Sequence, residues 1–241
     1  MQHDRDLLLY LFKFDSFTGK FVINLSNMVS VKVFCFNAFS ENTFLIQSDS
    51  MCIIVDPGCY VQDEYDELKT YISLEKLIPQ SIINTHCHID HVLGVAHLKE
   101  FYKIPFYISR KEQPVLQSAK LIAPVYGFSR FKEPEPDRFI EDGEMITLGA
   151  SKWKVLDVPG HSPGHIALYE ENEKLCIAGD VLFLRSIGRT DLPGGDYDTL
   201  IRSIRDQLFV LPDDVMVFPG HGPETTIGDE KHYNPFCGLN T

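Results

Sequence analysis

The sequence lacks three features, each of which would have indicated a different class of protein. Its six cysteines are scattered without a CxxC pair, which argues against a disulfide framework and against a Cys-rich structural zinc site. No run approaches the ~18–20 apolar residues that a membrane-spanning helix needs. Positive charge is scarce, since 22 Lys and Arg stand against 34 Asp and Glu, for a formal net charge of −12.

These absences exclude partners that are recognised through clustered positive charge. Proteins that bind nucleic acid or anionic membrane surfaces do so through clustered Lys and Arg. Because this chain carries a net negative charge, we expect neither as a partner. The apolar run Leu7–Phe12 is too short for a signal peptide and has no small-residue cleavage site behind it, which predicts a cytoplasmic protein. Hydrophobic residues make up 44% of the 241, enough for a substantial core. The oligomeric state stays open.

Residues 1–27 differ in pattern from the rest of the chain and carry no motif. Met28 stands directly before a strand-like run, so one hypothesis makes it the natural start and residues 1–27 an N-terminal extension. The alternative is an ordinary N-terminal strand or arm. We expect residues 28–241 to form one domain.

The order of the expected elements predicts the fold class. Short β-rich runs lie at 31–36, 43–47, 51–55, 81–84, 105–108, 144–148, 153–158, 165–169, 175–178, 181–184 and 215–218. Helical periodicity covers 62–77, 90–101, 113–121, 198–208 and 229–233, with Asp90 opening the second helix. A Pro-rich loop spans 124–142. This order of strands, helices, strands and helices favours two packed sheets with helices outside.

The segment THCHIDH at 85–91 is the most informative part of the chain. It places three imidazoles and one carboxylate directly after an apolar run: His86, His88, Asp90 and His91. These are the ligands that suit zinc and other borderline divalent ions. Four such groups side by side serve no packing purpose, so the segment predicts a metal site, built for more than one ion.

Four further polar residues each follow a short β run, in a turn rich in Gly or Pro. They are Asp56 in VDPG, His161 in PGHSPGH, Asp180 in AGD and His221 in PGHG. Strand ends can converge at one edge of a sandwich, and glycine lets the backbone bend sharply there. The turns that carry His161, Asp180 and His221 therefore supply the remaining donors of the predicted metal site.

Counting donors predicts a binuclear centre. One ion would be held by His86, His88 and His161, and a second by Asp90, His91 and His221. Asp180 has two carboxylate oxygens and can bridge the pair. A position open to water would remain, and two metals about 3.5–4 Å apart would lower the pKa of that water.

The combined motifs resemble the metallo-β-lactamase superfamily over about Val31 to Phe236. The resemblance implies an α/β fold, the αββα sandwich of two mixed β-sheets flanked by helices, with residues 28–241 as the hydrolase domain. It also implies two divalent metal ions, zinc in the first place, with iron and manganese as alternatives. The segment GRTD at 188–191 is similar to the glyoxalase II (hydroxyacylglutathione hydrolase)-like short subgroup.

That resemblance implies a metal-dependent hydrolase whose partner is a small-molecule thioester. Metal-bound hydroxide would attack a hydroxyacyl-thiol, and Asp90 would act in catalysis by orienting that hydroxide. An alternative is a mononuclear iron persulfide dioxygenase, in which His86, His161 and Asp180 hold the iron. A non-enzymatic metal-binding or docking protein is a third hypothesis.

The chain differs from three groups of the superfamily, and each difference narrows the range of possible substrates. Glyoxalase II proper has a C-terminal helical domain that helps to hold glutathione, and we expect it to be absent because the chain stops soon after His221. True β-lactamases of the superfamily lack the carboxylate seen as Asp180, which argues against β-lactam hydrolysis. The nucleases of the superfamily contain a large inserted domain, and this sequence has no segment long enough to form it.

Several neighbouring residues have expected supporting roles. Asp56 orients an imidazole ligand or, alternatively, caps its turn. His165 is expected to be structural, Arg189 and Asp191 to form a buried pair at the rim, and Cys87 to point away from the metals by strand alternation. The aromatic residues of the long loop either cover the site or pack the loop down: Tyr126, Phe128 and Phe131.

Overall fold

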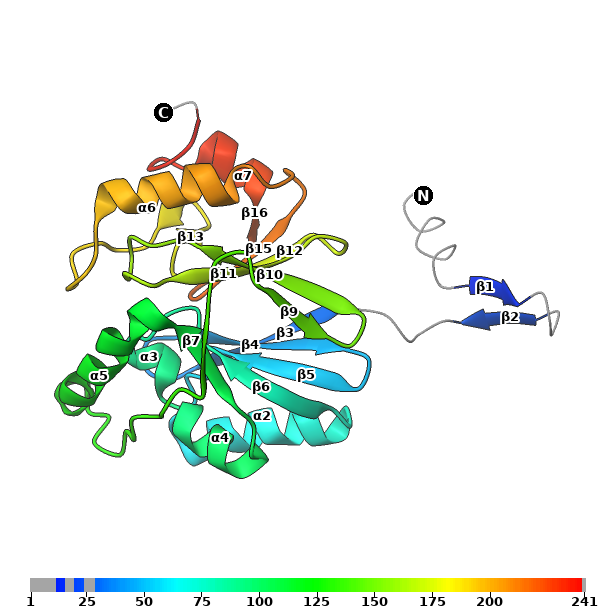
Figure 1. Cartoon of the computed structure of the whole chain (residues 1–241), viewed down its shortest axis with the longest axis horizontal. Coiled ribbons are helices and arrows are strands. Elements are labelled where there is room, and N and C mark those ends of the chain that lie inside the picture. Colours follow the sequence, from blue (N-terminus) through cyan, green and yellow to red (C-terminus); the bar gives the residue numbers. More distant parts are fainter. Residues whose placement is uncertain (1–11, 16–19, 24–28, 240–241) are drawn as a thin grey trace.

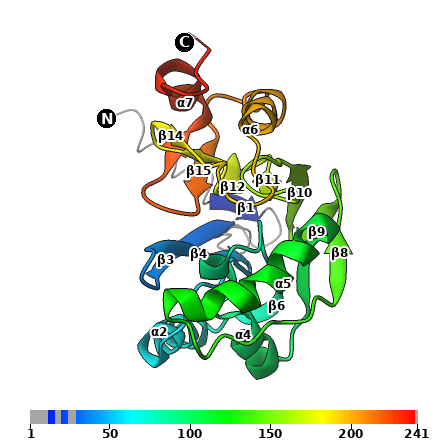
Figure 2. The ribbon, with the colours of Figure 1, turned by 90° about the vertical axis from the view of Figure 1, so that its left-hand side faces the viewer.

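The computed structural model describes residues 12–15, 20–23 and 29–239. Two six-stranded sheets lie face to face, and helices cover the outer face of each sheet (Figures 1 and 2). Both sheets contain parallel and antiparallel pairs. This confirms the αββα sandwich of two mixed sheets that the sequence predicts.

The first sheet has the strand order β3-β4-β5-β6-β7-β8. Its strands are β3 (Ser30–Phe36), β4 (Glu41–Ser48), β5 (Met51–Val55), β6 (Ile78–Ile83), β7 (Phe106–Ser109) and β8 (Arg138–Ile140). The covering helices are α2 (Gln62–Leu74), α3 (Ile89–Val92), α4 (Val95–Tyr102) and α5 (Gln113–Ile122), with short turns η1 (Arg110–Glu112) and η2 (Ala123–Tyr126). The pairs β5–β6, β6–β7 and β7–β8 are parallel, so these strands end at the same edge.

The second sheet has the strand order β16-β15-β12-β11-β10-β9. Its strands are β9 (Met145–Leu148), β10 (Ser151–Asp157), β11 (Ile166–Glu170), β12 (Leu175–Gly179), β15 (Met216–Pro219) and β16 (Thr225–Thr226). A two-stranded ribbon, β13 (Leu182–Phe183) and β14 (Ser186–Ile187), follows β12. The covering helices are α6 (Tyr197–Ser203), continued by the π-helical η3 (Ile204–Leu208), and α7 (Ile227–Tyr233).

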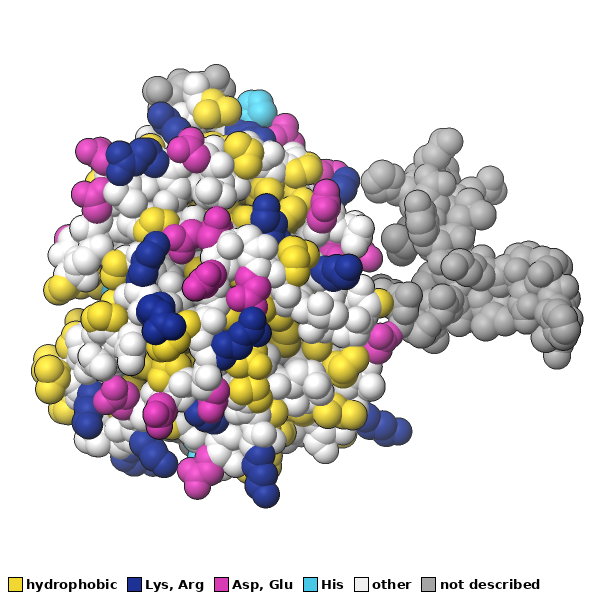
Figure 3. Space-filling view, viewed as in Figure 1, with side chains coloured by type: hydrophobic (Ala, Val, Ile, Leu, Met, Phe, Trp, Pro, Cys, Tyr) yellow, Lys and Arg dark blue, Asp and Glu magenta, His cyan; other side chains and the backbone are white. Residues whose placement is uncertain are grey.

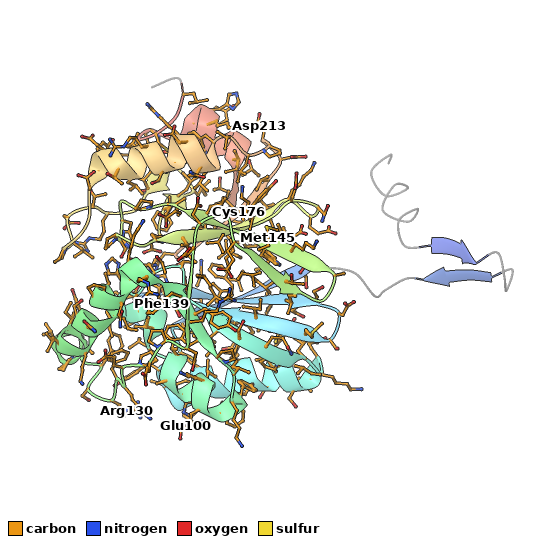
Figure 4. All side chains as sticks on the ribbon, viewed as in Figure 1. Glu100, Arg130, Phe139, Met145, Cys176 and Asp213 are labelled. Carbon is orange, nitrogen blue, oxygen red and sulfur yellow. The ribbon has the colours of Figure 1, made fainter. Side chains whose placement is uncertain are left out.

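The core consists of three layers of apolar side chains, because successive residues of a strand face opposite sides of its sheet. In β5, Ile53 and Val55 pack between the two sheets with Trp153 of β10. Their neighbours Cys52 and Ile54 face the helices instead. Two labelled residues mark the sheets in Figure 4: Phe139 lies in the first sheet and Cys176 in the second.

Two of the expected elements differ from the structure. The helix predicted over 90–101 is two helices separated at Leu93–Gly94. The first begins at Ile89, one residue before Asp90. The segment predicted as a loop over 124–142 contains most of η2 and the edge strand β8.

The N-terminal segment is described only in part. Strands β1 (Phe12–Asp15) and β2 (Lys20–Ile23) pair antiparallel with each other. Met28, the hypothetical natural start, lies outside the described residues. The division into residues 1–27 and 28–241 therefore stays a prediction.

The absences noted in the sequence have counterparts in the structure. All six cysteines are free, and five of them are buried. Within the described ranges, no helix combines the length and the apolar character that crossing a membrane requires. On the face seen in Figure 3, Lys and Arg side chains lie among Asp and Glu rather than in one continuous basic patch.

Candidate metal centre

The seven predicted ligands converge at one edge of the sandwich, where strands of both sheets end. Four follow β6, one lies between β10 and β11, one follows β12 and one follows β15: His86, His88, Asp90 and His91, then His161, Asp180 and His221. Gly220 permits this convergence, since a Cβ at that position would lie 2.1 Å from Asp180 Oδ1. The PGHG turn therefore needs glycine before its histidine.

The first group of donors comprises His86, His88 and His161. Their candidate ligand atoms all lie within 4.8 Å of one another. His88 Nδ1 is 2.9 Å from His161 Nε2, and the His86 ring stands nearly perpendicular to both of the others. Three imidazoles arranged in this way can share one ion.

The second group comprises Asp90, His91 and His221. Asp90 Oδ2 lies 3.2 Å from His221 Nε2 and 3.6 Å from His91 Nε2. The donor atoms of this group also lie within 4.8 Å of one another. His86 of the first group and His91 of the second also lie together with Asp56, so the two groups adjoin each other, and the division of the donors between two ions stays a prediction.

Asp180 lies between the two groups. Its Oδ2 is 3.5 Å from His161 Nε2 in the first group and 3.5 Å from His221 Nε2 in the second. Its Oδ1 is 3.5 Å from His91 Nε2. One carboxylate thus contacts both groups, which is the geometry that a bridging ligand requires.

The residues present fit divalent cations. Buried polar atoms are normally hydrogen-bonded, yet three atoms of the candidate ligands are buried without a hydrogen bond: His86 Nε2, His91 Nε2 and Asp180 Oδ1. Burial lowers the pKa of His86 and His161, and lowers the pKa of His88 to about 3. These imidazoles are therefore neutral, and only a neutral imidazole has the lone pair that binds a metal.

The carboxylates give the second group an excess of negative charge. Burial by itself lowers the pKa of His91, but Asp90 and Asp180 raise it well above the ordinary value. Burial raises the pKa of Asp180, but His91 and the other nearby imidazoles lower it well below its usual range. A cation would neutralise this charge in place of a proton on His91.

Most of the imidazoles are oriented through the ring nitrogen that faces away from the centre. Asp56 Oδ2 lies 3.2 Å from His91 Nδ1 and accepts a 2.6 Å hydrogen bond from Thr85 Oγ1, which in turn lies 3.1 Å from His86 Nδ1. Asp56 therefore orients two histidines, one directly and one through Thr85. Backbone carbonyls of Arg189 and Phe39 do the same for His161 and His221.

Two supporting residues were missed by the sequence reasoning because nothing local distinguishes them. Asn42 of β4 donates from Nδ2 to the carbonyls of Pro219 and Gly222, at 2.9 and 2.8 Å, and so ties the PGHG turn to the first sheet. Glu112 is fully buried and accepts hydrogen bonds from both loops that carry the first group.

The expected supporting roles have mixed outcomes. His165 Nε2 accepts the backbone N–H of Asp180 at 3.0 Å, which is a structural role. Arg189 and Asp191 do pair, but the pair is exposed rather than buried, because both residues lie in a surface turn. Cys87 is buried in the apolar cluster beside the helices; strand alternation does not explain this, because Cys87 lies outside β6.

A cavity of about 420 Å³ opens beside the two groups of donors. His88, Asp90 and His221 lie in its wall. Tyr126 lines it as well and contacts Phe39 edge-on at 5.4 Å. Of the remaining loop aromatics, Phe128 is buried and Phe131 packs against the core, so they pack the loop down.

Comparison with known proteins decides the family. The profile of the Metallo-beta-lactamase superfamily matches residues 37–221, which include all seven predicted ligands. The chain belongs to the metallo-β-lactamase superfamily. Members of this superfamily are generally hydrolytic enzymes that bind metal through His and Asp.

Three similar members of the superfamily cover most of the chain. Hydroxyacylglutathione hydrolase GloC of Haemophilus influenzae is 38% identical over 211 residues, which are 86% of this chain and 98% of that protein. The structure of TTHA1623 in a di-iron-bound form has a TM-score of 0.77 at 38% identity, covering 86% of this chain and 100% of that one. The structure of BLEG-1, described as a B3 metallo-β-lactamase, has a TM-score of 0.79 at 34% identity, covering 86% and 99%.

Proposed function

We propose that this member of the superfamily is a thioesterase that hydrolyses a hydroxyacyl-thiol at a binuclear metal centre. The observation that carries the proposal is the position of Asp180, whose carboxylate contacts both groups of donors beside an open cavity. The similarity to hydroxyacylglutathione hydrolase GloC supports the thioester as the class of substrate. The similarity to a di-iron protein leaves iron as an alternative to zinc.

The two groups of donors and Asp180 would hold the ions. When bound, two cations would acidify a water molecule and polarise the thioester carbonyl. Asp90 lies in the cavity wall and in the second group, so it can orient the attacking water. Addition of water forms a carbon–oxygen bond and breaks the carbon–sulfur bond, yielding a carboxylic acid and a thiol. The sulfur leaves readily as thiolate, so no strong general acid is needed.

A panel of thioesters tests this function. Zinc-loaded protein should hydrolyse S-lactoylglutathione or simpler acyl-thiols, and the activity should disappear when the metal is chelated. The substitution His88→Ala should abolish turnover, because it removes a donor of the first group. A matched control is His97→Ala, since His97 lies on α4 and contacts Lys69 and Tyr65 instead.

The panel also separates the competing functions. A β-lactam belongs on it because of the similarity to BLEG-1, and we expect no turnover of that compound. If no thioester were turned over above the chelated control, the proposal would be wrong.

A further inference from the structure

The cavity beside the candidate metal centre has an apolar wall. The wall comes from segments far apart in the sequence and consists mainly of aromatic and aliphatic side chains, among them Phe39, Val115, Ile122, Tyr126, Phe183 and Leu192. Three of these large side chains are substantially exposed although they line a cavity: Phe39 by 40%, Ile122 by 39% and Tyr126 by 52%. Apolar surface left open to water in a concave site indicates binding of an apolar group.

The same cavity offers little to an anionic substrate arm. Arg189 is the only Lys or Arg among the described residues that line it. Its guanidinium donates two hydrogen bonds to the Asp191 carboxylate, at 2.7 and 2.6 Å. Because the Asp191 carboxylate balances the charge of Arg189, this wall carries no net positive charge that would attract the carboxylates of glutathione.

We infer, on the basis of the proposed thioesterase function, that the thiol arm of the substrate is an uncharged aliphatic or aromatic group that packs in this cavity. A small hydroxyacyl group fills only part of the 420 Å³, so the cavity has room for the thiol arm as well. The metal-binding edge fixes the carbonyl, and the apolar wall selects the arm beyond the sulfur.

The size of the preference follows from the burial of apolar surface. Each methylene transferred from water to an apolar wall contributes about 0.8 kcal/mol, which corresponds to about fourfold in kcat/KM. Lengthening the thiol arm should therefore raise kcat/KM until the cavity is full. An anionic arm of similar size gains less, because its carboxylates lose water against a wall with no net positive charge.

The experiment compares lactoyl thioesters of ethanethiol, butanethiol, hexanethiol and glutathione, with the metal-loaded full chain. We expect kcat/KM to rise at least tenfold from the ethyl to the hexyl thioester, and the hexyl compound to exceed S-lactoylglutathione. If the alkyl thioesters were hydrolysed with equal kcat/KM, or if the glutathione thioester were preferred, this inference would be wrong and the proposed function would stand. No turnover of any thioester would overturn both.

A pair of variants on α5 tests the wall itself. Ile122→Lys places a cation in the cavity and should lower the hexyl-to-glutathione ratio of kcat/KM at least tenfold. Leu121→Lys is the matched control, because Leu121 is the preceding residue, is 78% exposed and does not line the cavity. Its ratio should stay within twofold of the parent. Equal ratios in both variants, with melting temperatures like the parent's, would contradict the assignment of this wall.

Discussion

Replacing Asp180 with Asn is expected to lower thioester turnover at least about 1000-fold and to reduce the bound metal from two ions per chain to one or fewer. The carboxylate contacts His161 of the first group and His221 of the second, so it can bind both ions. An amide has the same shape but lacks the negative charge. Losing several kcal/mol of charge stabilisation at a metal pair corresponds to about a 1000-fold loss of turnover. Metal content and kcat, measured on the same preparation, check this.

The control for this prediction is Asp214→Asn, which makes the same chemical change at an exposed carboxylate that pairs with Lys174. It should leave both metal content and turnover unchanged. An Asp180→Asn protein that kept two ions and turned over substrate within tenfold of the parent would show that the carboxylate does not bridge.

Replacing Glu112 with Ala is expected to destabilise the fold and weaken metal binding together. One oxygen of Glu112 accepts from Ser162 Oγ at 2.6 Å and from the Gly164 N–H at 2.7 Å, and the other accepts from the Cys87 N–H at 2.8 Å. These donors adjoin His161 and His86, so one carboxylate fixes both loops of the first group. Each buried donor left unpaired costs about 1–3 kcal/mol, which for three donors gives a total of about 3–9 kcal/mol.

Loss of this link should also weaken the metal affinity about 10–100-fold, as is typical when a group that orients ligands is removed. Thermal unfolding with and without zinc, together with zinc titration, measures both effects. A matched control is Glu170→Ala, because Glu170 is equally buried but accepts from Asn172 and Glu173 at the far end of β11. That variant should lose stability and keep its zinc affinity. Equal losses of affinity in the two variants would show that Glu112 acts only through general stability.

The sequence predicts most of the centre because its ligands are set by local patterns. Each predicted ligand belongs to a strand end followed by a turn, and the spacing of HxHxDH places four donors within one turn and one short helix. The fold class follows from the order of strands and helices along the chain. The supporting residues Asn42 and Glu112 could not be found in this way, since their partners lie 177 and 52 residues away along the chain.

The break in the helix predicted over 90–101 arises from a tertiary contact. The periodicity over 90–101 continues through Gly94, but the backbone N–H of Gly94 donates to the Pro57 carbonyl at 2.8 Å. A Cβ at Gly94 would lie 2.4 Å from Cys59 Sγ, so the turn after β5 packs directly against this residue. That close approach separates α3 from α4, and a helical pattern alone does not reveal it.

The most direct test of the binuclear thioesterase is the metal content of the protein from its native host, measured together with its turnover of acyl-thiols. The proposed arrangement predicts two divalent ions per chain and thioester hydrolysis that is lost on chelation and restored by the metal. One iron per chain, with oxygen uptake in the presence of a persulfide and no thioester hydrolysis, would contradict it and favour the dioxygenase.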